Sequence, residues 1–182
     1  MRSLKRSIEI ASDVAVILAV LGVGLLVVRN WNFHRSMAPE VGTTLTAIPG
    51  YRWADHDATL LLAMRQGCHY CEESMPLYRK LVEMDHAGQI KPHLVAVLPD
   101  SRQSAANLLE SQHLAIDYVA DLELSRLHVL GTPALLLLDG RGKVEQVWMG
   151  ELSVEDQKNL FEAISKSTAV ADAHLCATDE CR

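Results

Sequence analysis

The chain has 182 residues, of which 17 are lysine or arginine and 23 are aspartate or glutamate, so its formal net charge is −6. This acidic balance excludes a polybasic protein that binds nucleic acid, and a hydrophobic fraction of 49% excludes a disordered tail protein. Once an apolar N-terminal segment is set aside, about 140 residues remain, enough for one domain with its own core. Four cysteines are too few to frame so long a chain with disulfides, so we expect local cysteine chemistry.

An unbroken apolar run of 15 residues, 14–28, lies near the N-terminus. It is short for a membrane core of about 30 Å, so flanking residues must complete a span. We assign a transmembrane anchor to residues 11–33, behind a cytoplasmic N-terminus of residues 1–10, with Trp31 and Phe33 as interface side chains. Three basic residues precede the run and two follow it, which favours an exported C-terminal part.

A cleaved signal peptide and a buried helix of a soluble protein are the alternative interpretations of this run. A signal peptide has an apolar region of similar length, but no small-x-small cleavage site follows the run closely. The one candidate, Ser36-Met37-Ala38, is distant and is followed by Pro39. We therefore expect a single-pass protein of the inner (cytoplasmic) membrane, in contact with the lipid bilayer through this helix, with its domain on the periplasmic, extracytoplasmic side.

The remaining chain predicts short apolar strands that alternate with amphipathic helices. Residues 34–50 contain two prolines and two glycines with little periodicity and are expected to be a linker. We expect strands at 59–64, 93–98, 116–120, 134–138 and 143–149, helices at 71–84, 101–112 and 153–165, and a helical turn at 124–128. Residues 139–142 (Asp-Gly-Arg-Gly) predict a hairpin turn, so the last two strands should pair antiparallel. This order predicts an α/β fold with a mixed central sheet flanked by helices.

The segment Gly67-Cys68-His69-Tyr70-Cys71 places two cysteines just after a strand and at the start of a helix. There the helix N-terminus stabilises a thiolate, which lowers the pKa of the Cys68 thiol from its free value of about 8.5. Cys68 is the expected nucleophile, and Cys71 would resolve a mixed disulfide, so the pair can cycle between dithiol and disulfide. Two structural zinc ligands are the alternative, but no second Cys or His pair lies at ribbon or finger spacing.

With these cysteines the chain resembles the thioredoxin superfamily over residues 51–166. Two further marks agree: Pro76 lies five residues after the second cysteine, and Gly131-Thr132-Pro133 precedes a predicted strand. In that superfamily a proline kinks the active-site helix, and a cis-proline loop packs against the cysteines and helps to bind substrate backbone. The resemblance implies a thioredoxin-like fold, thiol-disulfide oxidoreductase activity, no cofactor, and substrate contacts from Thr132 and Pro133. Taken singly, Pro76 also fits a first helical turn, and Pro133 an ordinary trans proline that opens a strand.

The Tyr70-Cys71 ending and the Gly-Thr-Pro loop look most like exported disulfide isomerases and membrane-tethered periplasmic thioredoxin-like proteins. The implied partners are exported proteins with thiols or disulfides and a membrane or periplasmic redox partner. An isomerase usually needs a cradle made by dimerisation, and residues 34–50 leave no room for a dimerisation domain. A reductase or an oxidant of a few partners is therefore favoured.

The chain departs from cytoplasmic thioredoxins at two positions. Gly67 stands where they have a tryptophan, and Leu62 stands where they have a buried acid, so a proton acceptor for the resolving cysteine is not evident. His69 and Tyr70 lie between the cysteines and are expected to tune the pair. His69 either donates to the Cys68 thiolate, which makes the pair more oxidising, or points to solvent.

Residues 167–182 form a polar tail that holds Cys176 and Cys181, with His174 nearby. In an oxidising compartment we expect these cysteines to close a small disulfide loop. The alternatives are a redox relay that exchanges with Cys68, a metal site that includes His174, and free or intermolecular thiols. The other histidines show no ligand spacing and are expected at the surface: His34, His56, His86, His93, His113 and His128.

Two functions of other classes stay open beside the oxidoreductase. A copper chaperone would hold copper(I) with Cys68, Cys71 and a histidine, because soft thiolates suit that ion, although such chaperones typically use a wider cysteine spacing. A non-catalytic interaction module would keep the fold and use the groove to hold a partner.

Overall fold

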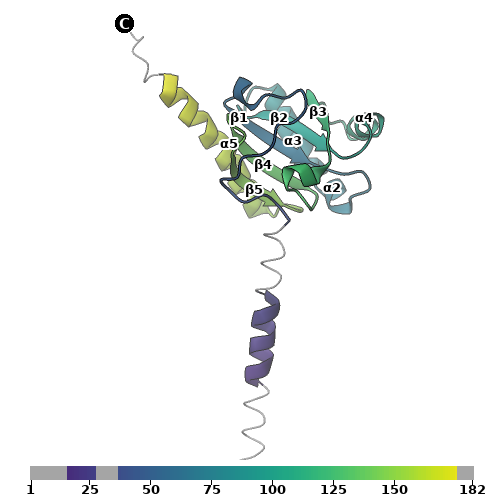
Figure 1. Ribbon diagram of the computed structural model, residues 1–182, viewed down its shortest axis with the longest axis vertical. Coiled ribbons are helices and arrows are strands. Elements are labelled where there is room, and N and C mark those ends of the chain that lie inside the picture. The colour runs from purple at the N-terminus through teal and green to yellow at the C-terminus, as the bar shows by residue number, and fades with distance from the viewer. Residues whose placement is uncertain (1–15, 28–36, 176–182) are drawn as a thin grey trace, which may run out of the picture. The chain divides into compact units, whose positions relative to one another are not determined.

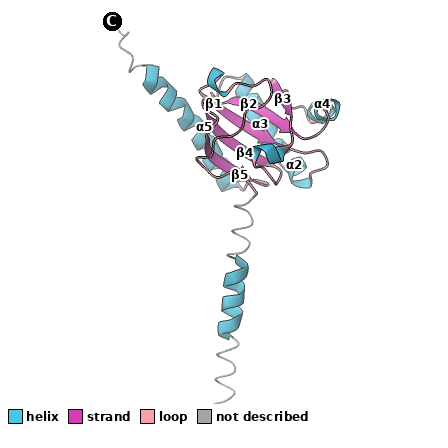
Figure 2. Cartoon of the chain, viewed as in Figure 1, coloured by secondary structure: helices cyan, strands magenta, loops and turns pink. Residues whose placement is uncertain are grey.

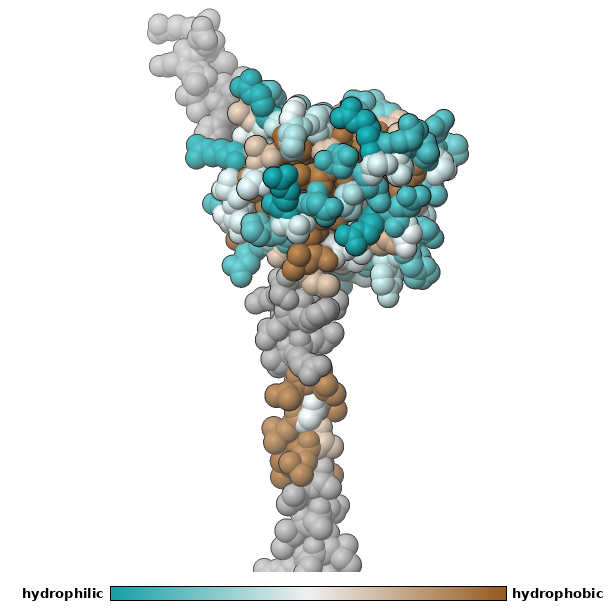
Figure 3. Space-filling view, turned by 45° about the vertical axis from the view of Figure 1, so that its right-hand side comes forward, coloured by the Kyte–Doolittle hydropathy of each residue, from teal (hydrophilic) through white to brown (hydrophobic). Residues whose placement is uncertain are grey.

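The computed structural model describes residues 16–27 and 37–175, with side chains described as far as Lys166. By its internal contacts the chain divides into two units, Met1–Ser36 and Met37–Arg182. In the first unit, residues 16–27 are helical, and their surface is apolar in the space-filling view (Figure 3). None of the helices in the described part of the chain combines the length and the apolar character that a membrane span requires. Most of the flanks of the predicted anchor, Trp31 and Phe33 included, lie outside the described residues.

The second unit is built on a five-stranded mixed sheet (Figures 1 and 2). Its strand order is β3-β2-β1-β4-β5, where β1 pairs parallel with β2 and β2 pairs parallel with β3. The other two pairings, β1 with β4 and β4 with β5, are antiparallel. The predicted mixed sheet and hairpin are confirmed. The strands are β1 (Ala58–Ala63), β2 (His93–Leu98), β3 (Tyr118–Asp121), β4 (Ala134–Asp139) and β5 (Val144–Met149).

The helices of this unit match the predicted ones, with two corrections. They are α2 (His69–Glu73), α3 (Met75–His86), α4 (Arg102–Ser111) and α5 (Val154–Leu175), joined by the 3-10 turns η1 (Trp53–Asp55) and η2 (Leu124–Leu127). The helix expected over 71–84 begins earlier, at His69, and is divided at Ser74. Pro76 lies in the first turn of α3. A proline there has no N–H for the carbonyl of Glu72 and its ring would clash with it, so a continuous helix is not formed.

The last helix is longer than predicted. Ser153 Oγ accepts the N–H of Asp156 at 3.2 Å, which confirms the expected cap. The helix does not end near Ser165 but continues to Leu175. The ten residues after Ser165 contain three alanines and no glycine or proline, so nothing in them stops a helix.

Apolar residues cover both faces of the sheet, and all six residues of β1 are buried. Leu60 and Leu62 point to a core shared with α3 and α5, whereas Leu61 and Ala63 point to a second core on the opposite face. Alternate residues of one strand therefore serve two cores, as expected for a sheet covered on both sides.

The segment predicted as a linker packs against the domain from Met37 onward, and we call residues 37–50 the strap (Figure 1). Within the strap, Leu45 is 4% exposed and Ile48 is 1% exposed, both in the second core. The Val144 N–H donates to the carbonyl of Thr43 at 2.8 Å, which adds backbone pairing at the start of β5. The strap carries its apolar residues at irregular spacing, so tertiary contact, and not a periodic pattern, decides its place.

Candidate active site

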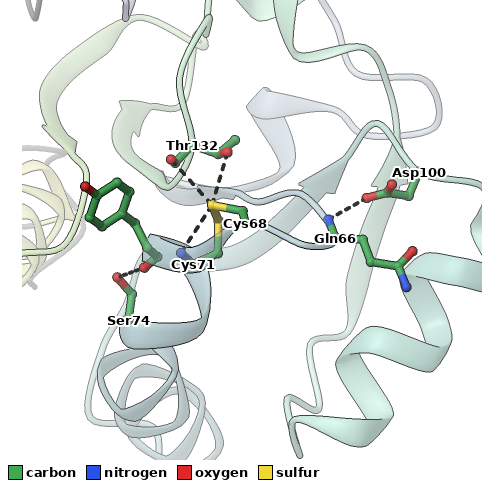
Figure 4. Close-up of a disulfide and its surroundings, with 7 residues drawn as sticks. Gln66, Cys68, Cys71, Ser74, Asp100 and Thr132 are labelled. Atoms are coloured by element: carbon green, nitrogen blue, oxygen red, sulfur yellow. Dashed lines mark hydrogen bonds between the residues drawn. A yellow bond between two sulfur atoms is a disulfide. The ribbon is translucent and has the colours of Figure 1, made fainter.

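Three loops meet at one edge of the sheet and form the site. Cys68 follows the end of β1, and Asp100 follows the end of β2, which runs parallel to it. Thr132 precedes β4, which runs antiparallel to β1 and so begins at the same edge. Residues from three separate parts of the sequence are thereby brought together (Figure 4).

Cys68 and Cys71 form a disulfide at the N-terminus of α2. Cys68 is the N-cap residue of this helix, and its Sγ accepts the N–H of Cys71 at 3.2 Å. Cys68 is half-buried, whereas Cys71 is only 1% exposed. Of the two cysteines, the one at the helix N-terminus is therefore the more exposed.

Thr132 lies against the sulfur of Cys68. Its Oγ1–H donates to Cys68 Sγ at 3.4 Å, and its carbonyl oxygen lies 3.5 Å from the same sulfur. The peptide bond between Thr132 and Pro133 is cis, which confirms the predicted cis-proline. Two donors, one from helix α2 and one from the cis-proline loop, thus converge on Cys68 Sγ, and donors of this kind stabilise a thiolate.

The two residues between the cysteines face outward. His69 Nε2 lies 3.3 Å from Glu73 Oε1, and the His69 side chain is 75% exposed. Of the two roles considered for His69, the structure therefore matches the solvent-facing one, with Glu73 as its neighbour. Tyr70 is 57% exposed, and its carbonyl accepts the hydroxyl of Ser74 at 2.7 Å.

The interior beneath Cys71 contains no acid. Leu62 is fully buried in β1, and among the described residues the buried polar side chains are only Thr59 and Ser74. Tyr78 is buried in the same core as Cys71, and this burial raises the pKa of its hydroxyl far above the usual range. Hence, among the described residues, no buried carboxylate is placed to take the proton of Cys71.

One contact at the site was not foreseen. The N–H of Gln66 donates to Asp100 Oδ2 at 3.1 Å, which links the loop before Cys68 to the end of β2 (Figure 4). The sequence held a signal for it. Pro99-Asp100 ends a predicted strand, and the carboxyl ends of neighbouring parallel strands lie at one edge.

A second cluster was also missed. The rings of His56 and His93 stack with centroids 4.1 Å apart, and the Tyr51 hydroxyl lies 3.1 Å from His93 Nδ1. These histidines lie at the starts of β1 and β2, away from Cys68 at the end of β1. They are distant in sequence, and only the parallel pairing of Thr59 with His93 brings them together.

No metal centre is evident in the described residues, where no group of three or more His, Cys, Asp or Glu side chains is placed to hold an ion. Cys176 and Cys181 lie outside the described residues, as does the side chain of His174.

The comparisons with known proteins agree with the fold. No protein-family model and no curated protein matches the chain. A thiol:disulfide interchange protein from Bacteroides sp. is similar in structure, with 17% identity, a TM-score of 0.53, and coverage of 69% of this chain and 91% of that chain. The thioredoxin domain of a thiol-disulfide oxidoreductase from Bacteroides vulgatus is similar too, with 19% identity, a TM-score of 0.53, and coverage of 69% and 98%. The chain therefore has a thioredoxin-like fold that carries a Cys68–Cys71 pair.

Proposed function

We propose that this protein is a thiol-disulfide oxidoreductase that exchanges disulfides with exported proteins, with Cys68 as the nucleophile and Cys71 as the resolving cysteine. The observation that carries the proposal is the asymmetry of the pair. Two donors converge on the half-buried Cys68 Sγ, whereas Cys71 is 1% exposed. The names of the similar solved structures, a thiol:disulfide interchange protein and a thiol-disulfide oxidoreductase, support the same chemistry.

The exchange has two steps. In the reducing direction the Cys68 thiolate attacks one sulfur of a substrate disulfide, a new S–S bond forms, and the other substrate sulfur leaves as a thiolate with the bonding electron pair. The Cys71 thiol then gives its proton to solvent, and its thiolate attacks Cys68 Sγ, which closes the Cys68–Cys71 disulfide and releases the second substrate thiolate. Two electrons pass to the substrate, whose thiolates take protons from solvent. The reverse steps oxidise a substrate dithiol.

The residues around the pair have proposed roles in binding and tuning. Thr132 and Pro133 shape the groove that receives an extended substrate backbone, because Thr132 already contacts the reacting sulfur. Tyr70 offers an exposed aromatic ring beside the cysteines for substrate side chains. His69 lies between the two cysteines, with its Nε2 3.3 Å from Glu73 Oε1, and has a proposed role in tuning the pair.

Residues 11–33 are proposed as a single membrane anchor that keeps the domain on the extracytoplasmic side. The apolar run at 14–28 and the excess of basic residues before it support this location. Carbonate extraction of membranes tests the anchor, and protease accessibility of the domain in spheroplasts tests its side. A domain that washes off the membrane, or resists protease until the cells are lysed, would reject the corresponding part of the proposal.

The reduction potential of the pair tests the activity. It is measured by equilibrating the full chain, with Cys176→Ser and Cys181→Ser, in glutathione or dithiothreitol buffers. A value of about −270 mV indicates a reductant and one of about −120 mV an oxidant. Absence of a reversible Cys68–Cys71 disulfide would remove the oxidoreductase from consideration. As a matched pair of variants, Cys71→Ser should trap mixed disulfides with partner proteins, whereas Cys68→Ser should trap none.

A further inference from the structure

We propose that Asp100 is a positioning residue for the nucleophile. Its carboxylate holds the loop of residues 65–67 and so sets where Cys68 Sγ lies relative to Thr132. The inference rests on the proposed function, since it concerns the reactivity of the same sulfur.

The loop before Cys68 has little support of its own. Arg65, Gln66 and Gly67 are all exposed, between the fully buried Met64 and the half-buried Cys68. Gly67 has a φ of +69°, so the chain turns sharply just before the cysteine. Within the part of the chain that the structure describes, the bond from Gln66 N–H to Asp100 Oδ2 is the one hydrogen bond that joins these three residues to the rest of the domain.

Asp100, by contrast, is attached to a rigid element. It follows β2, whose last residue Leu98 is fully buried in the core. The Met64 N–H donates to the carbonyl of Val97 at 3.1 Å, so the ends of β1 and β2 are fixed to each other where the loop begins. Asp100 is half-buried and lies on a bend directly after Pro99, whose ring restricts the backbone there. The backbone that carries the Asp100 carboxylate is therefore fixed independently of its bond to the Gln66 N–H.

This geometry matters to catalysis because the contacts of Cys68 Sγ are short and directional. The sulfur has its donors at 3.2 Å, from Cys71, and at 3.4 Å, from Thr132. If the loop of residues 65–67 moves by a fraction of an ångström, the bond from Thr132 Oγ1 to Cys68 Sγ lengthens and the thiolate is stabilised less. An ionised carboxylate binds an N–H more strongly than a neutral acceptor does, which suits a single contact that must hold an exposed loop.

The test measures the rate at which the Cys68 thiolate reacts with iodoacetamide, as a function of pH, in the reduced full chain with Cys176→Ser and Cys181→Ser. We expect Asp100→Ala to raise the apparent pKa of Cys68 and to lower the rate at a fixed pH about tenfold. Asp100→Asn keeps an oxygen that can accept the Gln66 N–H, and we expect it to recover the rate to within about threefold of wild type. Asp121→Ala is the matched control, because this exposed acid ends the neighbouring strand β3 and makes no bond to the loop.

Two results would overturn the proposal: wild-type rate and pKa in Asp100→Ala, or equal impairment of Asp100→Asn and Asp100→Ala, which would show that an oxygen able to accept the Gln66 N–H does not restore the position of Cys68. Amide hydrogen exchange in the wild-type protein tests the bond even if the alanine variant does not fold. The Gln66 amide should exchange about tenfold more slowly than the amide of Gly67, which is also an exposed residue, and equal exchange would reject the contact. A wild-type protein without a reversible Cys68–Cys71 disulfide would instead refute the proposed function, independently of Asp100.

Discussion

Replacement of Thr132 by valine removes one donor from the sulfur of Cys68 and little else, because the two side chains have nearly the same shape. The lost contact is the 3.4 Å bond from Thr132 Oγ1–H to Cys68 Sγ. A hydrogen bond to a charged group contributes about 1.5–3 kcal/mol, and the lower end applies here because Thr132 and Cys68 are both half exposed. At about 1.4 kcal/mol per pKa unit, the pKa of Cys68 should rise by about one unit. The reduced form loses the same stabilisation where Cys68 is ionised, so the potential should fall by about 30 mV.

The pKa is measured from the ultraviolet absorbance of the thiolate as the reduced protein is titrated, and the potential from its equilibrium with glutathione. Thr132→Ser is the control, since it keeps the hydroxyl and should stay close to wild type in both quantities. An unchanged pKa in Thr132→Val, or an equal shift in the serine variant, would show that the hydroxyl does not stabilise the thiolate.

Two further predictions concern stability. Burial and the neighbouring His56 lower the pKa of His93 below its usual 6.5, so the unfolded chain binds a proton more readily than the folded one. The free energy of unfolding should therefore fall as the pH drops below about 6.5. Urea titrations at a series of pH values measure this dependence on pH, and His93→Gln should weaken it. An unchanged pH dependence in His93→Gln would contradict this account. Gly142 has a φ of +75°, and a Cβ there would lie 2.7 Å from the Trp53 ring, so Gly142→Ala should destabilise the domain by about 1–3 kcal/mol. Gly88→Ala is the matched control, with a φ of +65° and open space around a Cβ, and the clash account fails if the two variants lose equal stability in urea unfolding.

The parts of the fold that the sequence predicted well are those decided by local pattern. The short apolar runs within β1 and β4, residues 60–63 and 134–138, predicted buried strands, and the turn at 139–142 leads directly into a hairpin. The cysteine pair was found for a similar reason, since its spacing and its place after a strand form a local motif, whereas the cis-proline was expected from the resemblance to the thioredoxin superfamily. Existence and type of these elements were predictable, whereas the end of α5 was not, because no local residue stops that helix.

The parts that were missed depend on contacts between distant residues. The strap has no periodic pattern, and its burial follows from the sheet face that it covers. The stacking of His56 on His93 depends on the register of β1 against β2, which neither strand encodes alone. The bond from Gln66 to Asp100 belongs to the same class, because it joins two loops that are neighbours only once the strands are parallel.

The strap begins beside the cis-proline loop. The N–H of Leu130 donates to the carbonyl of Met37 at 2.7 Å, and a Cβ on Gly131 would lie 3.4 Å from the sulfur of Met37. A shortened chain that starts at Pro39 would therefore lack Met37 and its contacts with Leu130 and Gly131, in the loop that contacts Cys68. A reduction potential measured on that chain would describe an altered site. Any shortened version of this protein should be designed with its N-terminal boundary treated as part of the surface around Cys68.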